Sequence, residues 1–256
     1  MSVTAVIGSR GRMGAMLMER LEAAGRTARG ADLPLTPDVL AAACAGADVA
    51  LLCVPAAVLE ETAHKAAPHM PESCALADIT SVKMLPVRAM ERAWSGPVVG
   101  THPLFGPKTV SERYAVTVTP GRGWKEGEAL PEQDAGAVRL VEELFASLGW
   151  SSFRCSPETH DRAMASIQGL NYITSLAYFA MLSRKPELLP FLTPSFERRK
   201  EAARTMLTSD SAMFAGIFAA NPMSQEAVRE FRSYLNVAAG GDIEVLAELA
   251  KGWFPE

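Results

Sequence analysis

Residues 3–14 read Val-Thr-Ala-Val-Ile-Gly-Ser-Arg-Gly-Arg-Met-Gly, and the architecture expected for the chain follows from this stretch. Val3 to Ile7 form a short, continuous apolar run that is typical of a buried strand. After the glycines, Met13, Leu17 and Leu21 recur every four residues, which indicates a helix. A strand that leads through a glycine turn into a helix predicts the start of a βαβ unit.

The turn between this strand and helix has the spacing GxxGxxG, with Gly8, Gly11 and Gly14. In dinucleotide-binding folds such glycines allow a sharp exit from the strand, close approach of a pyrophosphate and close helix packing. The N–H groups and dipole at a helix N-terminus favour a phosphate. The strict pattern is GxGxxG, so this turn alone is weak evidence. We predict the following cofactor-binding residues: Gly8, Ser9, Arg10, Gly11, Arg12, Met13, Gly14, Asp32, Val54 and Pro55.

Asp32 indicates which dinucleotide is bound. It lies 18 residues after Gly14, at the end of the second predicted strand. A carboxylate there accepts hydrogen bonds from the adenosine ribose and repels a 2′-phosphate, so we expect NAD rather than NADP as the cofactor. The other interpretation of Asp32 is a solvated loop acid before Pro34. Nearby arginines also weaken the distinction between the two cofactors: Arg10, Arg12 and Arg29.

The first part of the chain alternates predicted strands with predicted helices. The strands cover 3–7, 28–33, 48–54, 73–79, 97–101, 114–119 and 151–155, and the helices cover 12–24, 37–45, 58–67, 85–93 and 135–148. The alternation of residues 114–119 is that of an edge strand. This order predicts an α/β fold, with a Rossmann-like, mostly parallel sheet as the N-terminal NAD-binding domain of residues 1–156.

From residue 157 onward almost every segment is predicted to be helical: 161–183, 194–207, 211–220, 224–238 and 243–253. We therefore expect residues 157–256 to form an all-helical substrate and dimerisation domain. Residues 163–181 are apolar nearly all round, and such a helix must be buried on every face. In a helical domain of about 100 residues a partner subunit is the simplest way to cover such a helix, so we expect a homodimer formed through the helical domain.

Composition excludes several classes of protein. Charged residues make up 21 % of the 256 residues and the net charge is −4, so neither nucleic acid nor an anionic membrane is expected as a partner. No apolar run reaches the length of about 18 residues that spans a bilayer. The four cysteines have no zinc-site spacing, and we expect no metal. The chain starts directly as a strand without a signal peptide pattern, so we expect a cytoplasmic protein.

Three polar clusters follow predicted strands: 54–55, 78–83 and 100–107. Ligands bind outside the carboxyl ends of the strands in an open parallel sheet. His102 in the third cluster can accept a hydroxyl proton while a carbon–hydrogen bond breaks, as an alcohol dehydrogenation requires. The other interpretation of His102 is a packed loop histidine. We interpret His64, His69 and His160 as structural.

At these residues the sequence resembles the prephenate/arogenate (cyclohexadienyl) dehydrogenase family of tyrosine biosynthesis. The resemblance covers essentially the whole chain, and its most specific part is the run Thr-His-Pro-Leu-Phe-Gly-Pro at 101–107. The matching blocks are Gly8-x-x-Gly11-x-Met13-Gly14, Asp78-x-Thr80-Ser81-Val82-Lys83, Gly100 to Pro107, His160-Asp161-x-x-Met164 and Ile167-Gln168-x-Leu170.

The resemblance implies an NAD-dependent oxidation at C4 of a cyclohexadienyl ring, coupled to loss of CO₂ from C1. By the motif, His102 is the catalytic hydrogen-bond acceptor for the C4 hydroxyl, and Ser81 holds that hydroxyl and the histidine in register. Thr101 and Gln168 are implied as substrate-binding residues. The expected substrate is prephenate, with arogenate or a 4-amino ring analogue as the alternative.

Two positions depart from the family pattern. Asn171 stands where members carry a substrate-facing histidine, and Glu197 stands, in ungapped register, where they carry an arginine that grips a carboxylate. A shift of one residue restores an arginine, and a bidentate grip on a carboxylate favours that residue type, so we predict Arg198 with Arg204 as a further candidate. If Glu197 holds the position, the ammonium group of arogenate or an amino analogue fits better.

Two other functions stay open. A non-catalytic NAD-binding homologue would be consistent with both departures. A different Rossmann dehydrogenase with a helical dimer domain, such as a β-hydroxyacid dehydrogenase, would need a lysine near the substrate in the helical domain. Residues 161–182 contain no lysine, which argues against it.

Overall fold

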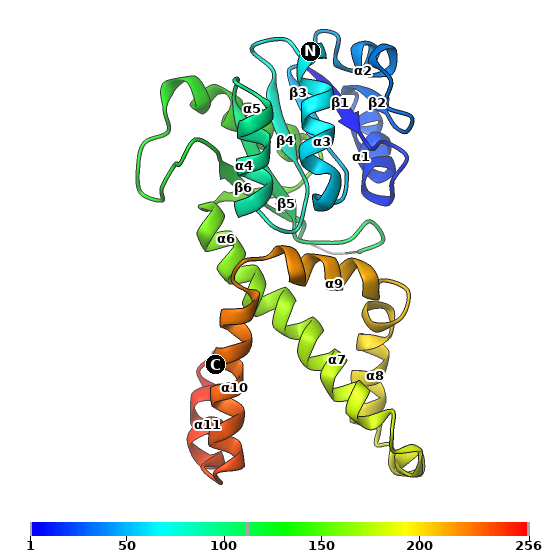
Figure 1. Cartoon of the computed structure of the whole chain (residues 1–256), viewed down its shortest axis with the longest axis vertical. Coiled ribbons are helices and arrows are strands. Elements are labelled where there is room, and N and C mark those ends of the chain that lie inside the picture. The colour runs from blue at the N-terminus through cyan, green and yellow to red at the C-terminus, as the bar shows by residue number, and fades with distance from the viewer. Residues whose placement is uncertain (1, 111–112, 255–256) are drawn as a thin grey trace. The chain divides into compact units, whose positions relative to one another are not determined.

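The computed structural model describes residues 2–110 and 113–254. The chain divides into two compact units, residues 1–161 and residues 162–256 (Figure 1). The first unit is built around a sheet, and the second is entirely helical apart from its connecting turns.

One sheet organises the first unit. Its strands are β1 (Val3–Ile7), β2 (Thr27–Ala31), β3 (Val49–Leu52), β4 (Ala75–Asp78), β5 (Val98–Pro103), β6 (Ala115–Pro120) and β7 (Ser151–Arg154). They lie in the order β2-β1-β3-β4-β5-β6-β7. Strands β1 to β5 are parallel, β6 is antiparallel to β5, and β7 is parallel to β6. The predicted Rossmann-like, mostly parallel sheet is confirmed.

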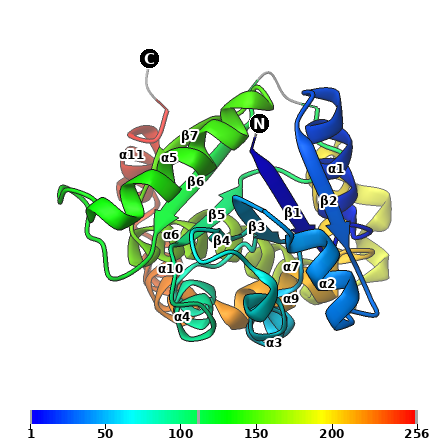
Figure 2. The ribbon, with the colours of Figure 1, turned by 90° about the horizontal axis from the view of Figure 1, so that it is seen from above.

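Helices cover both faces of this sheet (Figure 2). They are α1 (Arg12–Ala23), α2 (Pro37–Cys44), α3 (Ala56–Ala66), the 3₁₀ turn η1 (Ala67–His69), α4 (Met84–Ala93) and α5 (Glu132–Ser147). Successive strand residues alternate between two cores, so that Ile7 packs with α2, α3 and α4 while Val6 packs with α1 and α5. Burial on both faces explains why the central strands read as continuous apolar runs.

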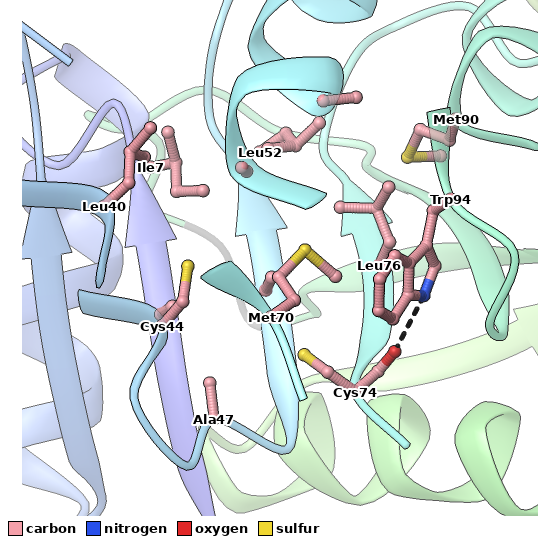
Figure 3. Close-up of a cluster of buried hydrophobic side chains, with 14 of the residues drawn as sticks. Ile7, Leu40, Cys44, Ala47, Leu52, Met70, Cys74, Leu76, Met90 and Trp94 are labelled. Carbon is pink, nitrogen blue, oxygen red and sulfur yellow. Dashed lines mark hydrogen bonds between the residues drawn. The ribbon is translucent and has the colours of Figure 1, made fainter. Parts of the chain in front are cut away.

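The core that α2, α3 and α4 cover contains several large side chains, among them Met70, Met90 and Trp94 (Figure 3). The indole Nε1 of Trp94 donates a hydrogen bond of 3.0 Å to the carbonyl oxygen of Cys74. Met70 and Met90 fill the space around Leu76. Cys74 and Cys44 are buried free thiols in this core.

The expectation that residues 114–119 form an edge strand is wrong. Strand β6 lies inside the sheet between β5 and β7, and the four-residue β7 is the edge strand on that side of the sheet. Val116 and Val118 alternate with threonines, a pattern that suggests one solvated face. Thr117 and Thr119 are nevertheless buried. Threonine in an alternating strand therefore does not indicate a solvent-exposed face in the way that a charged residue does.

The second unit continues from α6 (Pro157–Met164), which spans the division between the units. Its elements are the π-helical turn η2 (Ala165–Gly169), α7 (Leu170–Leu182), the 3₁₀ segment η3 (Pro186–Phe191), α8 (Pro194–Leu207), α9 (Ser211–Ala220), α10 (Ser224–Ala239) and α11 (Ile243–Lys251). In α7 only Tyr172 and Ser175 are buried. The single chain thus does not bury the apolar segment on every face.

The turn after β1 is closely packed at Gly14. A Cβ built on Gly14 would lie 2.1 Å from the carbonyl oxygen of Gly8, closer than real side chains approach. Gly8 has a φ of +91°, and a Cβ built on it would lie 2.5 Å from the carbonyl oxygen of Cys53. The backbone of the turn therefore leaves no room for a side chain at either position.

We predict that Gly14→Ala lowers the free energy of unfolding by about 1–3 kcal/mol, because the added methyl group overpacks two backbone segments. Urea denaturation measures the change. Gly136→Ala is the matched control, since Gly136 is an exposed glycine inside α5 with nothing within 4 Å of its Cβ position. That substitution is expected to raise the free energy of unfolding by about 0.5–1 kcal/mol. Equal effects at the two sites would contradict the packing argument.

Candidate active site

The carboxyl ends of the parallel strands meet at one edge of the sheet. Ile7 pairs in register with Ala31 on one side and with Leu52 on the other. Leu52 in turn pairs with Asp78, and Asp78 with Gly100. The residues that follow these five positions therefore lie along the same edge. The chain leaves β1 toward β2 and returns to its other side through β3, so the glycine turn lies at the point where strand order reverses.

The glycine turn is held to the end of β2 by backbone hydrogen bonds. The N–H groups of Gly8 and Ser9 both donate to the carbonyl oxygen of Ala31, at 2.8 Å and 3.1 Å. Gly11 is the N-cap of α1 and supplies no side-chain cap, and the first turn of α1 contains no acidic residue. This helix N-terminus thus has the features of an anion site: a dipole end without a side-chain cap or a carboxylate.

Asp32 follows β2 directly and is tied to the turn. Its Oδ2 accepts a hydrogen bond of 2.7 Å from the backbone N–H of Arg10, and its Oδ1 accepts one of 2.8 Å from Leu33. The backbone hydrogen bond from Arg10 is the main cause that lowers the pKa of Asp32. The Arg10 guanidinium donates to the carbonyl oxygen of Leu33. The structure therefore brings Ser9, Arg10 and Asp32 together, whereas Val54 and Pro55 follow β3.

A fully buried ion pair joins the ends of β4 and β5. The Lys83 ammonium donates to both carboxylate oxygens of Asp78, at 2.7 Å and 2.6 Å, and to the carbonyl oxygen of Thr101 at 2.6 Å. Both side chains have 0 % exposure. Burial lowers the pKa of Lys83, and the Asp78 carboxylate opposes this shift. Three donors on one ammonium thus hold two adjacent strand ends in a fixed relation.

Thr101 is part of this ion-pair cluster. Its backbone N–H donates to Asp78 Oδ1 at 3.2 Å, and its hydroxyl donates to the Asp78 carbonyl oxygen. The Thr101 side chain is completely buried. These contacts give Thr101 a role in holding the strand ends, next to the substrate-binding role predicted for it. Ser81 lies half-buried in the loop from Asp78 to Lys83, three residues beyond β4.

His102 lies within β5 and is 5 % exposed, so it is a strand residue and not the loop residue expected from the sequence. Its Nδ1 is 3.1 Å from Nε2 of His160. Nδ1 of His160 is in turn 2.8 Å from Oδ1 of Asp161. The interpretation of His160 as merely structural therefore misses its direct contact with the proposed catalytic residue.

The pKa values of both histidines are lowered, which favours their neutral form. Burial is the largest cause that moves the pKa of His102 well below its usual value of 6.5, and His160 and Lys83 add to this shift. Burial likewise lowers the pKa of His160, against the hydrogen bond that its Nδ1 donates to Asp161, which raises the pKa. A neutral imidazole at the end of β5 is a group that can accept a proton.

The remaining predicted site residues belong to the second unit. Gln168 lies in the π-helical turn η2, and among the described residues its buried Oε1 has no hydrogen-bond partner. Such turns are frequent at functional sites. Asn171 is exposed in the first turn of α7.

The arginine candidates lie on α8 with different surroundings. Arg198 is exposed, and Glu197 forms an ion pair of 2.6 Å with Lys200. Arg204 pairs with Glu201 at 2.8 Å and lines a cavity of about 350 Å³ together with Lys200. Of Arg198 and Arg204, only Arg204 lines this cavity.

Comparison with known proteins gives a family match for the first unit. The model of the prephenate dehydrogenase nucleotide-binding domain matches residues 19–118. The T-protein of Enterobacter agglomerans is 27 % identical over 230 residues, covering 88 % of this chain and 58 % of that protein. A probable arogenate/prephenate dehydrogenase of Methanocaldococcus jannaschii is 31 % identical over 186 residues, covering 70 % of this chain and 40 % of that protein. The chain thus spans about half the length of these curated relatives.

Solved structures show the same fold. Prephenate dehydrogenase from A. aeolicus, crystallised with hydroxyphenyl propionate and NAD⁺, superposes with a TM-score of 0.77 at 21 % identity, covering 98 % of this chain and 96 % of that one. Synechocystis arogenate dehydrogenase superposes with a TM-score of 0.77 at 18 % identity, covering 98 % and 97 % of the two chains. Within residues 2–110 and 113–254, no helix combines the length and apolar character needed to cross a bilayer.

We predict that the free energy of unfolding falls as the pH decreases from about 7.5 to about 5.5. His102 and His160 have pKa values below 6.5 in the folded chain, so the unfolded chain binds more protons in this range. Each of the two histidines contributes a slope of up to about 1.4 kcal/mol per pH unit. Urea denaturation at several pH values measures the slope, which His102→Asn should reduce. An equal slope in this variant would contradict the buried, neutral state of His102.

Proposed function

Because its nucleotide-binding domain places the chain in the prephenate/arogenate dehydrogenase family, we propose that it catalyses the NAD-dependent oxidative decarboxylation of prephenate to 4-hydroxyphenylpyruvate in tyrosine biosynthesis. The observation that carries the proposal is the neutral, buried His102 at the edge of the sheet where the glycine turn also lies. A dinucleotide site and a proton acceptor at one sheet edge are the two requirements of an alcohol dehydrogenation.

The residues of the turn fit a dinucleotide. The backbone at Gly8 and Gly14 has no space for a Cβ, and the N-terminus of α1 has neither a side-chain cap nor an acidic residue in its first turn. Residues 8–14 would hold the pyrophosphate, Asp32 the adenosine ribose, and Val54 and Pro55 would line the site beyond β3. Bound NAD supplies the acceptor for the hydride that leaves C4 of the ring.

The chain's own residues handle the proton and the orientation of the ring. His102 accepts the proton of the C4 hydroxyl as the carbon–hydrogen bond at C4 breaks. The Ser81 hydroxyl holds the C4 hydroxyl in register with His102. Loss of CO₂ from C1 then leaves an aromatic ring. The buried Lys83–Asp78 pair positions both groups, because it ties the loop that carries Ser81 to the strand that carries His102.

Gln168, Asn171 and an arginine of α8 are the proposed substrate-binding residues of the second unit. Arg198 is our candidate for the carboxylate grip, and Arg204 is a further candidate. Arogenate or a 4-amino ring analogue is the second candidate substrate. Glu197, which in ungapped register stands where the family pattern has an arginine, favours it because a carboxylate can pair with an ammonium group.

We also propose that the chain forms a homodimer through its helical unit. Helices α10 and α11 pack on each other and still expose large apolar side chains: Phe231, Tyr234, Leu235, Ile243, Val245 and Leu249. Ile167 and Met181 of the apolar segment 163–181 are more than half or half exposed, at 56 % and 50 %. An apolar surface of this kind supports a protein–protein interface. A cytoplasmic location stays a prediction.

We predict that the purified protein reduces NAD in the presence of prephenate, or of arogenate, and that NADP is a poorer cofactor. His102→Asn is expected to lower kcat by at least about 10²-fold, because the proton acceptor is lost, while the affinity for NAD stays the same. Absorbance of the reduced cofactor follows turnover, and fluorescence titration follows NAD binding. A protein that turns over neither substrate, although it binds NAD, would be the non-catalytic homologue instead.

We predict a dimer mass in solution by light scattering. Leu249→Glu, which places a carboxylate on the exposed apolar face of α11, should shift the population to monomer. Val110→Glu is the matched control, because Val110 is an exposed apolar residue of the first unit. A monomer mass for the unaltered protein, or the same shift in both variants, would argue against a dimer through the helical unit.

A further inference from the structure

A chain of hydrogen bonds leads from a helix N-terminus to the His102 ring. The Asp161 carboxylate accepts the backbone N–H of Lys83 on Oδ1, at 2.7 Å, and that of Met84 on Oδ2, at 2.9 Å. Lys83 is the N-cap of α4 and Met84 its first residue. Asp161 therefore caps α4 from outside the helix, a favourable place for a carboxylate. Neither of its oxygens offers a proton to the His160 ring.

Because the Asp161 carboxylate is an acceptor, the directions of the His160–Asp161 and His102–His160 hydrogen bonds follow. Since Asp161 accepts at Oδ1, Nδ1 of His160 must carry the proton of their 2.8 Å contact. In a neutral imidazole the other nitrogen is then an acceptor. Nε2 of His160 consequently accepts in its 3.1 Å contact with His102, and Nδ1 of His102 must be the donor.

The opposite arrangement would require a charged imidazole. If Nδ1 of His102 were the acceptor, His160 would have to donate from both nitrogens and carry a positive charge. His160 is 1 % exposed, and the Lys83 ammonium already lies in the same buried cluster. Burial lowers the pKa of His160, which disfavours that charge. The neutral arrangement leaves both rings with one proton each, on Nδ1.

We infer that Asp161 and His160 are positioning residues that fix His102 in the tautomer with its proton on Nδ1 and a bare Nε2. Histidine in water favours the tautomer with its proton on Nε2, so the contacts of His102 Nδ1 impose the less common form. No other hydrogen bond engages the His102 ring among the described residues.

The inference deepens the proposed function and rests on it for its catalytic meaning. A bare Nε2 is the atom that can take the proton of the C4 hydroxyl. When that oxygen–hydrogen bond breaks, the proton moves to Nε2, and the electron pair stays on the oxygen to form the ring carbonyl. The His102 imidazolium keeps its Nδ1–H bond to His160 throughout. The wrong tautomer would present an N–H to the hydroxyl and could not accept its proton.

The tautomer can be read directly in the unaltered protein without any substrate. In protein with ¹⁵N-labelled histidine, long-range ¹H–¹⁵N correlation spectra distinguish protonated from bare ring nitrogens. The His102 signals are assigned by their absence in His102→Asn. We expect Nδ1 of His102 to be protonated and Nε2 bare near neutral pH. A His102 ring that carries its proton on Nε2 would overturn the inference.

Removal of the acceptor provides the second test. His160→Phe keeps an aromatic ring but no nitrogen, so we expect the His102 signals to move toward the Nε2-protonated form. For an enzyme with the proposed activity we expect kcat to fall at least about tenfold and KM for the ring substrate to change much less. His64→Phe is the matched control, because His64 is an exposed histidine near the end of α3. It should change neither spectrum nor turnover.

The outcomes separate this inference from the proposed function. Absence of turnover with prephenate and arogenate would contradict the proposed function, while the spectrum of His102 would still decide the tautomer. A folded His160→Phe protein with an unchanged His102 spectrum would overturn the inference. If His160→Phe does not fold, His160→Gln replaces it, because its amide oxygen can accept the Nδ1–H of His102. That variant should keep the His102 tautomer, and a change to the Nε2-protonated form would count against the inference.

Discussion

The buried ion pair between Lys83 and Asp78 is the interaction on which the candidate site depends. A charged pair at zero exposure is stable only when nearly all of its hydrogen-bonding groups have partners, and here Thr80 and Thr101 complete the set. Loss of the ammonium would leave a buried carboxylate without its charge partner at the end of β4. Through this pair, the loop after β4 is tied to the end of β5.

Lys83 takes part both in this ion pair and in the capping of α4. Lys83 supplies its ammonium to Asp78 and its backbone N–H to Asp161, so the residue joins the strand ends to the start of α6. His160 contacts Asp161 through its Nδ1 and His102 through its Nε2. Low dielectric strengthens each hydrogen bond in such a cluster and also makes every unpaired group costly. Removal of any one of these partners would therefore leave a buried polar group without its hydrogen bond.

The sequence predicted the fold closely because its signals are local. The strand Val3 to Ile7, the glycine turn and the alternation of strands and helices each follow from backbone sterics and apolar periodicity. The position of β6 could not be predicted, since order in a sheet depends on contacts distant in sequence. His102 was identified from its place near a strand end. His160 and Asp161 were not given a role, because nothing in a helix-capping stretch shows which distant ring it will contact.

The cap that Asp161 provides to α4 links the stability of the fold to the proposed catalytic activity, two properties that often oppose each other. In many enzymes the groups that perform chemistry are strained, and selection for robustness removes them. Here a single carboxylate closes a helix end and orients the ring beside it. A library of variants selected only for resistance to heat would retain Asp161 and, with it, the orientation of His160. At this position, selection for stability would also preserve the geometry that the proposed reaction needs.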